Sequence, residues 1–227
     1  MPPGDALVLG LHSATSRSGV ALVSGGRVIA EVGFEAGNAP ARRLVPSARF
    51  ALEALGLRLE DLTGIGVSVG PGSFTGIRVG LATARGLSMS TGCPVAGIST
   101  LRSLAAEAGG LAPRVAAWID AGRGELYTAL YRRLADGHLD LEGDESLSTP
   151  DAALGALPHE PLRIVGSGAA RYAELLARRA VGDTIEPGLG LLAGSVARLA
   201  ALDLASGRAA TPAPIYLRPP DALRGQA

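Results

Sequence analysis

A glycine-rich turn is the segment whose residues could most readily do chemistry. Residues 70–76 read Gly-Pro-Gly-Ser-Phe-Thr-Gly, and they join an apolar, strand-like run at 65–69 to a helical pattern at 77–89. Such a turn presents backbone N–H groups at the positive end of a helix dipole, which suits a phosphate or a carboxylate. Ser73 and Thr75 could cap the helix or contact that anion.

The charge around the turn favours the same class of ligand. No Asp or Glu lies between Leu62 and Ala106, whereas Arg78, Arg85 and Arg102 lie within this stretch. A molecule bound here is therefore expected to be anionic.

A purely structural interpretation of the turn competes with anion binding. Gly76, Gly80 and Ala84 are spaced four residues apart on one helix face, and small residues in that pattern let a helix approach a sheet or another helix closely. Both interpretations remain open from the sequence.

Several nucleotide-dependent and hydrolytic mechanisms are excluded. All 21 basic residues are Arg, so there is no P-loop lysine, kinase lysine or Schiff-base lysine. A Rossmann site would need an acidic residue about 20 positions beyond the turn, and none occurs before Glu107. Ser73 lacks the G-x-S-x-G setting of a hydrolase nucleophile and has no His near it in the sequence.

Metal-ligating residues are equally sparse. Cys93 is the single cysteine, and His12, His138 and His159 have no spacing that fits a zinc site. For Mg²⁺ the second half offers only Asp120 at the end of a strand-like run, where a lone Asp is more commonly a turn or cap residue. We therefore predict no metal site, no cofactor site and no catalytic residue.

The composition describes a globular, neutral chain. It has 227 residues with 21 basic and 21 acidic side chains, and 47% of its residues are hydrophobic. A net charge of zero argues against strong nucleic-acid binding by the chain alone, because phosphate neutralisation needs clustered positive charge. No apolar run reaches the ~18 to 20 residues of a membrane span, and together with the single cysteine this predicts a cytoplasmic protein that does not associate with membranes.

The first half alternates apolar runs with turn signals. Strands are expected near 7–11, 19–23, 27–32, 65–69 and 94–98, and helices at 41–55, 77–89 and 99–108. Pro46 must either open the first of these helices or kink it.

The second half repeats this order of elements. Strands are expected at 114–120, 125–131, 138–141 and 162–166, and helices at 151–157 and 169–179. A helix at 191–205 then precedes a Pro-rich tail at 212–220, which we expect to dock through Ile215 and Leu217. Two meander-plus-crossover units predict a duplicated α/β fold of the actin-like (RNase H-like, ASKHA) class, with half-domains at 1–110 and 111–227.

Four segments of this chain together resemble one known family. The longest runs from Val67 to Gly80 and continues through Ala84-Arg85-Gly86-Leu87 to Leu101; the others are Ser13-Ala14-Thr15, Ile119–Tyr127 and Pro214–Arg218. In order and spacing they are similar to the signature of the TsaB (YeaZ) family, and the similarity spans nearly the whole chain.

The resemblance implies a function as well as an actin-like fold. Members of this family take part in making N6-threonylcarbamoyladenosine beside the anticodon of tRNA. It implies a non-catalytic subunit that pairs with the TsaD transferase and works with the ATPase TsaE and the threonylcarbamoyl-AMP supplier TsaC. A stand-alone actin-like ATPase or small-molecule kinase remains the alternative.

Two positions depart from the family pattern. His12-Ser13 stands where the family usually has Asp-Thr, and Pro40 stands where it often has a His. Both changes remove residues that a nucleotide or metal site would use, and they leave a scaffold role untouched.

The resemblance also implies a docking surface on the helices at 41–55 and 77–89. Helical spacing offers six candidate interface residues: Val45, Arg49, Leu52, Ile77, Leu81 and Arg85. Apolar side chains there would be costly to leave in water, so the isolated chain is expected to form a homodimer through the same surface. Transfer RNA is expected to bind only through the complex.

Overall fold

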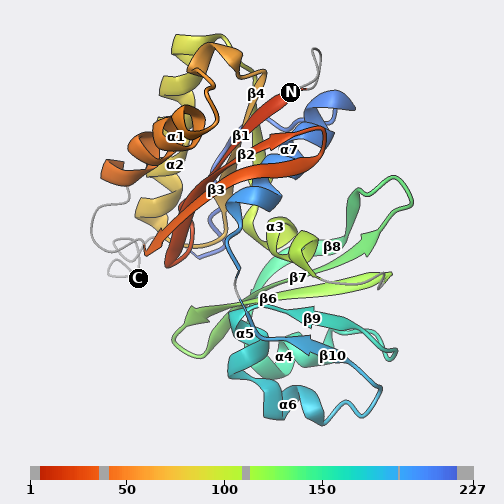
Figure 1. Ribbon diagram of the computed structural model, residues 1–227. Coiled ribbons are helices and arrows are strands. Elements are labelled where there is room, and N and C mark those ends of the chain that lie inside the picture. The colour runs from red at the N-terminus through yellow and green to blue at the C-terminus, as the bar shows by residue number, and fades with distance from the viewer. Residues whose placement is uncertain (1–5, 36–40, 109–112, 189, 219–227) are drawn as a thin grey trace. The chain divides into compact units, whose positions relative to one another are not determined.

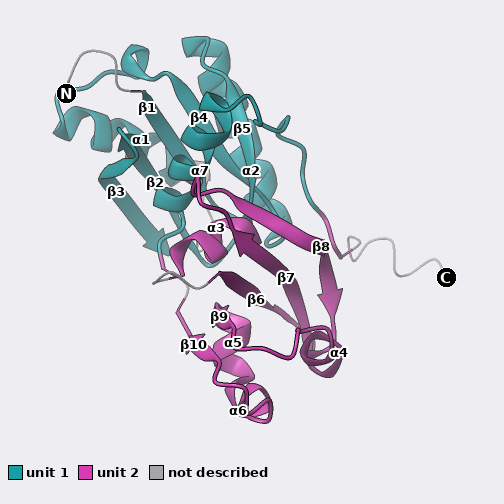
Figure 2. Cartoon of the chain, turned by 90° about the vertical axis from the view of Figure 1, so that its right-hand side faces the viewer, with its two compact units in different colours: residues 1–100, 191–215 teal, residues 101–190, 216–227 magenta. Residues whose placement is uncertain are grey.

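The computed structural model describes residues 6–35, 41–108, 113–188 and 190–218. The chain forms two compact units (Figure 2). Unit 1 combines residues 1–100 with 191–215, and unit 2 combines residues 101–190 with 216–227. No helix in the described ranges combines the length and the apolar character that crossing a bilayer demands.

Unit 1 is built on a five-stranded mixed sheet (Figure 1). Its elements are β1 (Leu7–His12), β2 (Arg17–Ser24), β3 (Arg27–Glu35), α1 (Ala41–Ala54), the 3-10 turn η1 (Leu59–Asp61), β4 (Gly64–Gly70), α2 (Phe74–Thr91), β5 (Val95–Ser99) and α7 (Ala193–Ala205). The strand order is β3-β2-β1-β4-β5, in which β1, β2 and β3 form an antiparallel meander and β4 and β5 run parallel to β1.

Unit 2 repeats that plan. Its elements are α3 (Thr100–Glu107), which starts at the boundary between the units, β6 (Arg114–Gly122), β7 (Glu125–Arg133), β8 (Leu139–Ser148), α4 (Pro150–Gly155), β9 (Arg163–Val165), α5 (Ser167–Arg171), α6 (Ala173–Ala177) and β10 (Thr184–Glu186). The sheet order β10-β9-β6-β7-β8 has the same parallel and antiparallel pairings as the sheet of unit 1. The predicted duplication is therefore confirmed.

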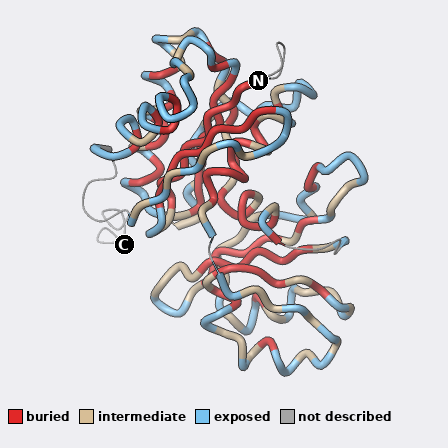
Figure 3. The backbone as a smooth tube through the Cα atoms, in the orientation of Figure 1, coloured by how far each residue is buried: buried red, intermediate tan, exposed pale blue. Residues whose placement is uncertain are grey.

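The sheet of unit 1 is covered on both faces. Strands β1, β2 and β4 are buried along nearly their whole length (Figure 3). Helices α1 and α2 pack on one face, and α7 packs on the other against β1, β2 and β4. Glycines on the α7 face allow this close approach, because a Cβ at Gly66 would lie 2.6 Å from Cβ of Ala200 and one at Gly10 would overlap the carbonyl oxygen of Ala193.

The packing of α7 changes the expected division of the chain. Half-domains at 1–110 and 111–227 would assign the helix at 193–205 to the second half, whereas contacts group it with unit 1. The amphipathic pattern of 191–205 predicts a helix correctly, but it does not say which sheet that helix covers. The boundary inside the chain also falls at residue 100 rather than 110.

Three smaller features concern Pro46, an additional strand and the tail. Pro46 lies inside α1 and not at its first position, and the short strand β10 was not predicted. The tail docks on unit 1 as expected for Ile215, whose N–H donates to the carbonyl oxygen of Val69 at 2.7 Å. Ile215 also packs against the apolar core of that unit.

Candidate functional site

The glycine-rich turn joins β4 to α2 and is filled by the chain itself. The N–H of Ser73 donates to the carbonyl oxygen of Ala14 at 2.7 Å. A Cβ at Gly72 would overlap that same oxygen, and a Cβ at Gly76 would overlap the carbonyl oxygen of Ser13. Backbone from the loop after β1 therefore occupies the place where a phosphate would need to approach the turn.

A hydrogen bond from Ser13 connects this loop to the start of α2. Its Oγ donates to the carbonyl oxygen of Gly76 at 2.7 Å, and a Cβ at Gly80 would lie 2.8 Å from the same Oγ. Ser73 caps the helix by accepting from the N–H of Gly76 at 3.2 Å. Of the two interpretations that the sequence left open, this geometry supports close packing by Gly76 and Gly80.

His12 ends β1 as a fully buried side chain. Its Nδ1 lies 2.6 Å from Oγ of Ser68, and its Nε2 lies 2.9 Å from Oγ1 of Thr15. Thr15 donates its hydroxyl proton to the carbonyl oxygen of Arg17, so it accepts from the Nε2–H of His12, and Nδ1 accepts from Ser68. Burial lowers the pKa of His12 to about 4, and the imidazole is neutral near pH 7.

Asp120 is held by neighbours within unit 2. Its Oδ2 accepts from Nη1 of Arg171 at 2.8 Å, and its Oδ1 accepts from the N–H of Gly122 at 3.0 Å. Its own N–H donates to Oγ of Ser167 at 3.1 Å. These contacts are those of a turn residue that also forms an ion pair, in agreement with the structural interpretation of Asp120.

The remaining candidate metal ligands do not lie close to one another. His138 is buried beside Asp136 in the turn between β7 and β8, His159 is exposed after α4, and the Cys93 thiol donates to the carbonyl oxygen of Leu62. Among the described residues, no group of three or more His, Cys, Asp or Glu side chains could hold a metal ion. Pro40 lies outside the described residues.

The six predicted interface residues divide into two sets. Val45, Arg49 and Arg85 are exposed on α1 and α2. Leu52, Ile77 and Leu81 are exposed by only 2%, 0% and 7%, so they pack in the core of unit 1 and offer a partner little surface. Their burial on the inner side of each helix counts against the prediction for these three residues.

Two exposed apolar side chains on the same helices were missed by the sequence analysis. Phe50 on α1 is 64% exposed and Met89 on α2 is 88% exposed. Both stand opposite the apolar faces of their helices, so helical spacing could have found them as apolar residues on a face with no core to join. Gly86 and Ala82 are also exposed on α2, and nothing lies within 4 Å of a Cβ built on Gly86.

The three arginines of the acid-free stretch do not share one unit. Arg78 and Arg85 are exposed on α2 in unit 1, whereas Arg102 lies on α3 in unit 2. The guanidinium of Arg78 stacks over the ring of Phe74 at 3.9 Å from the ring centroid, which fits a local packing role.

Two sheets of identical strand order, each a meander followed by parallel strands, define the duplicated actin-like α/β class. The solved structure of an ROK hexokinase from Thermus thermophilus shares this fold over 88% of the chain, with a TM-score of 0.55 and 15% sequence identity. A family model described as TsaD: tRNA N6-adenosine threonylcarbamoyltransferase matches residues 34–175.

The chain belongs to the TsaB (YeaZ) family. It is 30% identical over 220 residues to the tRNA threonylcarbamoyladenosine biosynthesis protein TsaB of Haemophilus influenzae, a match that covers 93% of each chain. The solved structure of YeaZ from Pseudomonas aeruginosa matches 93% of the chain and 100% of its own, with a TM-score of 0.80 and 30% identity. The match to TsaB of Escherichia coli is 36% identical and covers 63% of that protein, less than two thirds of its length.

Proposed function

We propose that this chain is a non-catalytic subunit of the machinery that forms N6-threonylcarbamoyladenosine in tRNA, and that it activates a TsaD-like transferase by pairing with it. The relatives in its family carry the name of this biosynthesis. The proposal assigns the chain a structural role in that process, with the bond-forming step on the partner.

One observation carries the non-catalytic part of the proposal. The carbonyl oxygens of Ser13 and Ala14 occupy the glycine-rich turn, which is the segment best suited by its sequence to hold a phosphate. The polar side chains that end β1 and β6 support the same conclusion. His12 is buried and neutral, and Asp120 is bound to Arg171.

The docking part of the proposal rests on α1 and α2. We define the outer face of these helices by their exposed residues, which are Val45, Arg49, Phe50, Arg85, Gly86 and Met89. Covering an aromatic or Met side chain is worth roughly 1.5–3 kcal/mol, so Phe50 and Met89 favour association. An exposed Gly inside a helix costs about 1 kcal/mol relative to Ala, and close approach by a partner helix at Gly86 would offset that cost.

The other partners follow from the same assembly. A TsaE-like ATPase joins the pair, a TsaC-like enzyme supplies threonylcarbamoyl-AMP, and tRNA binds to the complex and not to this chain alone. In the absence of the transferase, two copies of this chain form a homodimer through the outer face of α1 and α2.

Pairing is tested by co-purification with the TsaD-like protein of the same organism. Phe50→Glu and Met89→Glu are expected to leave the fold intact and to abolish both co-purification and homodimer formation, because each places a charge in the contact. Leu141→Glu is the matched control, since Leu141 is 42% exposed on β8 of unit 2. Unchanged pairing of both α1–α2 variants would overturn the docking proposal.

Enzymatic activity is tested separately. The purified chain without a partner is expected to show no ATP turnover. Turnover at catalytic rates would instead support a stand-alone ATPase or small-molecule kinase.

A further inference from the structure

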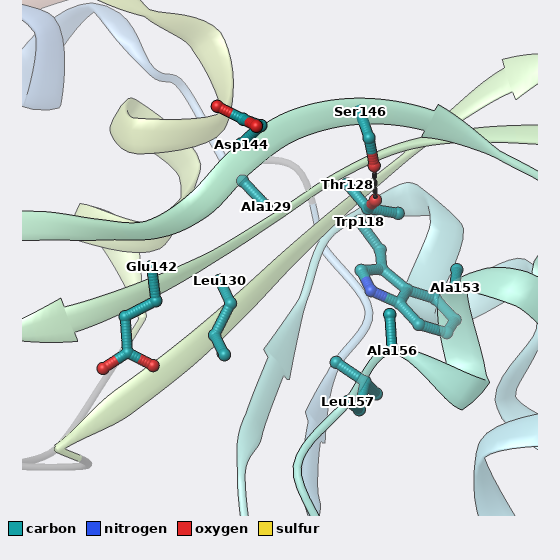
Figure 4. Close-up of a pocket in the computed structure, with 10 residues that line it drawn as sticks. All are labelled: Trp118, Thr128, Ala129, Leu130, Glu142, Asp144, Ser146, Ala153, Ala156 and Leu157. Carbon is teal, nitrogen blue, oxygen red and sulfur yellow. Dashed lines mark hydrogen bonds between the residues drawn. The ribbon is translucent and has the colours of Figure 1, made fainter.

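Unit 2 contains a cavity of about 220 Å³ that the proposed function does not use. It lies on the sheet face covered by α4, between that helix and strands β7 and β8 (Figure 4). Its apolar walls include Trp118, Leu130, Ala153 and Leu157.

An irregularity in strand pairing opens this cavity. Thr128 pairs with Ser146 and Leu130 pairs with Glu142, so the single residue Ala129 stands opposite the three residues 143–145 of β8. Gly143 adopts a positive φ of 82° within this bulge, a conformation that suits glycine. The opposite wall is provided by Ala153 of α4 and by Ala156 and Leu157, which follow the helix.

The indole N–H of Trp118 is a hydrogen-bond donor that faces the cavity (Figure 4). Trp118 is only 1% exposed, its indole N–H makes no hydrogen bond to a described residue, and its nitrogen keeps some contact with solvent. Figure 4 shows the indole nitrogen turned toward the space between Leu130 and Leu157. An occupant with an oxygen acceptor would pair with this N–H in place of water.

The rim of the cavity carries uncompensated negative charge. Glu142 forms an ion pair with Arg114 at 2.9 Å, so its charge is balanced. Asp144 is exposed and forms no ion pair with any described residue. An occupant that places a positive charge at this rim is therefore favoured over a neutral or anionic one.

The size of the cavity limits the occupant. A volume of about 220 Å³ holds about seven water molecules, and it is below the roughly 300–1,000 Å³ of sites for drug-sized ligands. We propose that this cavity binds a residue-sized cation: a guanidinium or ammonium group on a short apolar stem that also carries a carbonyl acceptor. An arginine or lysine residue of a peptide has this chemistry, whereas a free alkyl cation lacks the carbonyl.

Trp118 allows direct detection of binding, because it is the single Trp of the chain. We would titrate the full chain with N-acetyl-L-arginine amide, with its neutral isostere N-acetyl-L-citrulline amide and with butylguanidine, and follow indole fluorescence. The arginine derivative is expected to bind about tenfold more tightly than the citrulline derivative because of its charge. It is also expected to bind more tightly than butylguanidine, which lacks a carbonyl acceptor for the indole N–H.

Two variants and one control complete the test. Asp144→Asn is expected to remove the preference for arginine over citrulline, and Ala156→Leu is expected to block all three probes by filling the cavity. Asp140→Asn, on the same strand but outside the cavity, should change neither result. Equal binding of the arginine and citrulline derivatives to the unmodified chain, or no binding of any probe, would overturn the proposal.

Discussion

Oγ of Ser68 lies 2.6 Å from Nδ1 of His12, and both side chains are almost completely buried. The contact joins the adjacent parallel strands β4 and β1 near the glycine-rich turn. The buried, neutral imidazole satisfies both of its nitrogens through Ser68 and Thr15. At the end of β1, both ring nitrogens of His12 therefore have hydrogen-bond partners within the protein.

This burial makes stability depend on pH. The pKa of His12 falls from 6.5 to about 4 on folding, so the unfolded chain binds more protons between these values. The contribution of His12 to the free energy of unfolding is fully present above about pH 6.5, and it is lost as the pH drops toward 4. From pH 7 to pH 5 the loss should be about 2 kcal/mol, measured by urea unfolding at each pH.

Two variants separate His12 from other titrating groups. His12→Gln should lose most of the pH dependence between pH 7 and pH 5. His159→Gln should retain it, because His159 is exposed. An identical slope in the unmodified chain and in His12→Gln would show that other groups control the acid sensitivity.

Two glycines of α2 provide a matched pair for the packing interpretation. Gly76→Ala should destabilise the chain by about 1–3 kcal/mol, because the new methyl group overlaps the carbonyl oxygen of Ser13. Gly86→Ala meets open space and should stabilise the isolated chain by about 0.5–1 kcal/mol. Urea unfolding of both variants checks this, and similar effects at the two sites would contradict the structure of the turn.

Substitutions at the buried residues should lower stability, whereas those on the outer face of α1 and α2 should prevent dimer formation and leave the fold intact. Leu52→Glu and Leu81→Glu each place a charge in the core of unit 1, so they should unfold the chain or lower its stability by several kcal/mol. Phe50→Glu and Met89→Glu should keep the circular dichroism and melting behaviour of the unmodified chain while remaining monomeric in sedimentation. A folded Leu81→Glu variant that loses only dimerisation would restore Leu81 as an interface residue.

The isolated chain should bind tRNA weakly. Arg78 and Arg85 supply few phosphate contacts on unit 1, and Arg102 lies in unit 2. A salt titration of tRNA binding should give low affinity at physiological salt and a shallow slope. Tight binding with a steep slope that flattens in an Arg78/Arg85/Arg102 triple Ala variant would identify an RNA-binding protein.

Much of the fold could be predicted from local patterns. Apolar runs bounded by turn residues located both meanders, and the repeated order of elements predicted the duplication. The position of α7 was not predictable, since its apolar face fits either sheet. The contacts of Gly10 and Gly66 with this helix depend on tertiary packing, which the local sequence does not specify. For the site, the burial of Leu52 and Leu81 could have been derived from their spacing with Leu44 and Ala84. The bulge at Gly143 that opens the cavity beside Trp118 depends on strand register, which the sequence of β8 does not specify.

In the proposed assembly this chain activates a partner and does no chemistry itself. The most direct test of this role is a reconstitution with the TsaD-like, TsaE-like and TsaC-like proteins of the same organism and unmodified tRNA, in which N6-threonylcarbamoyladenosine is measured by mass spectrometry. Product is expected only when this chain is present, and none is expected with a Phe50→Glu/Met89→Glu double variant. Equal product without the chain, or with the double variant, would contradict this role.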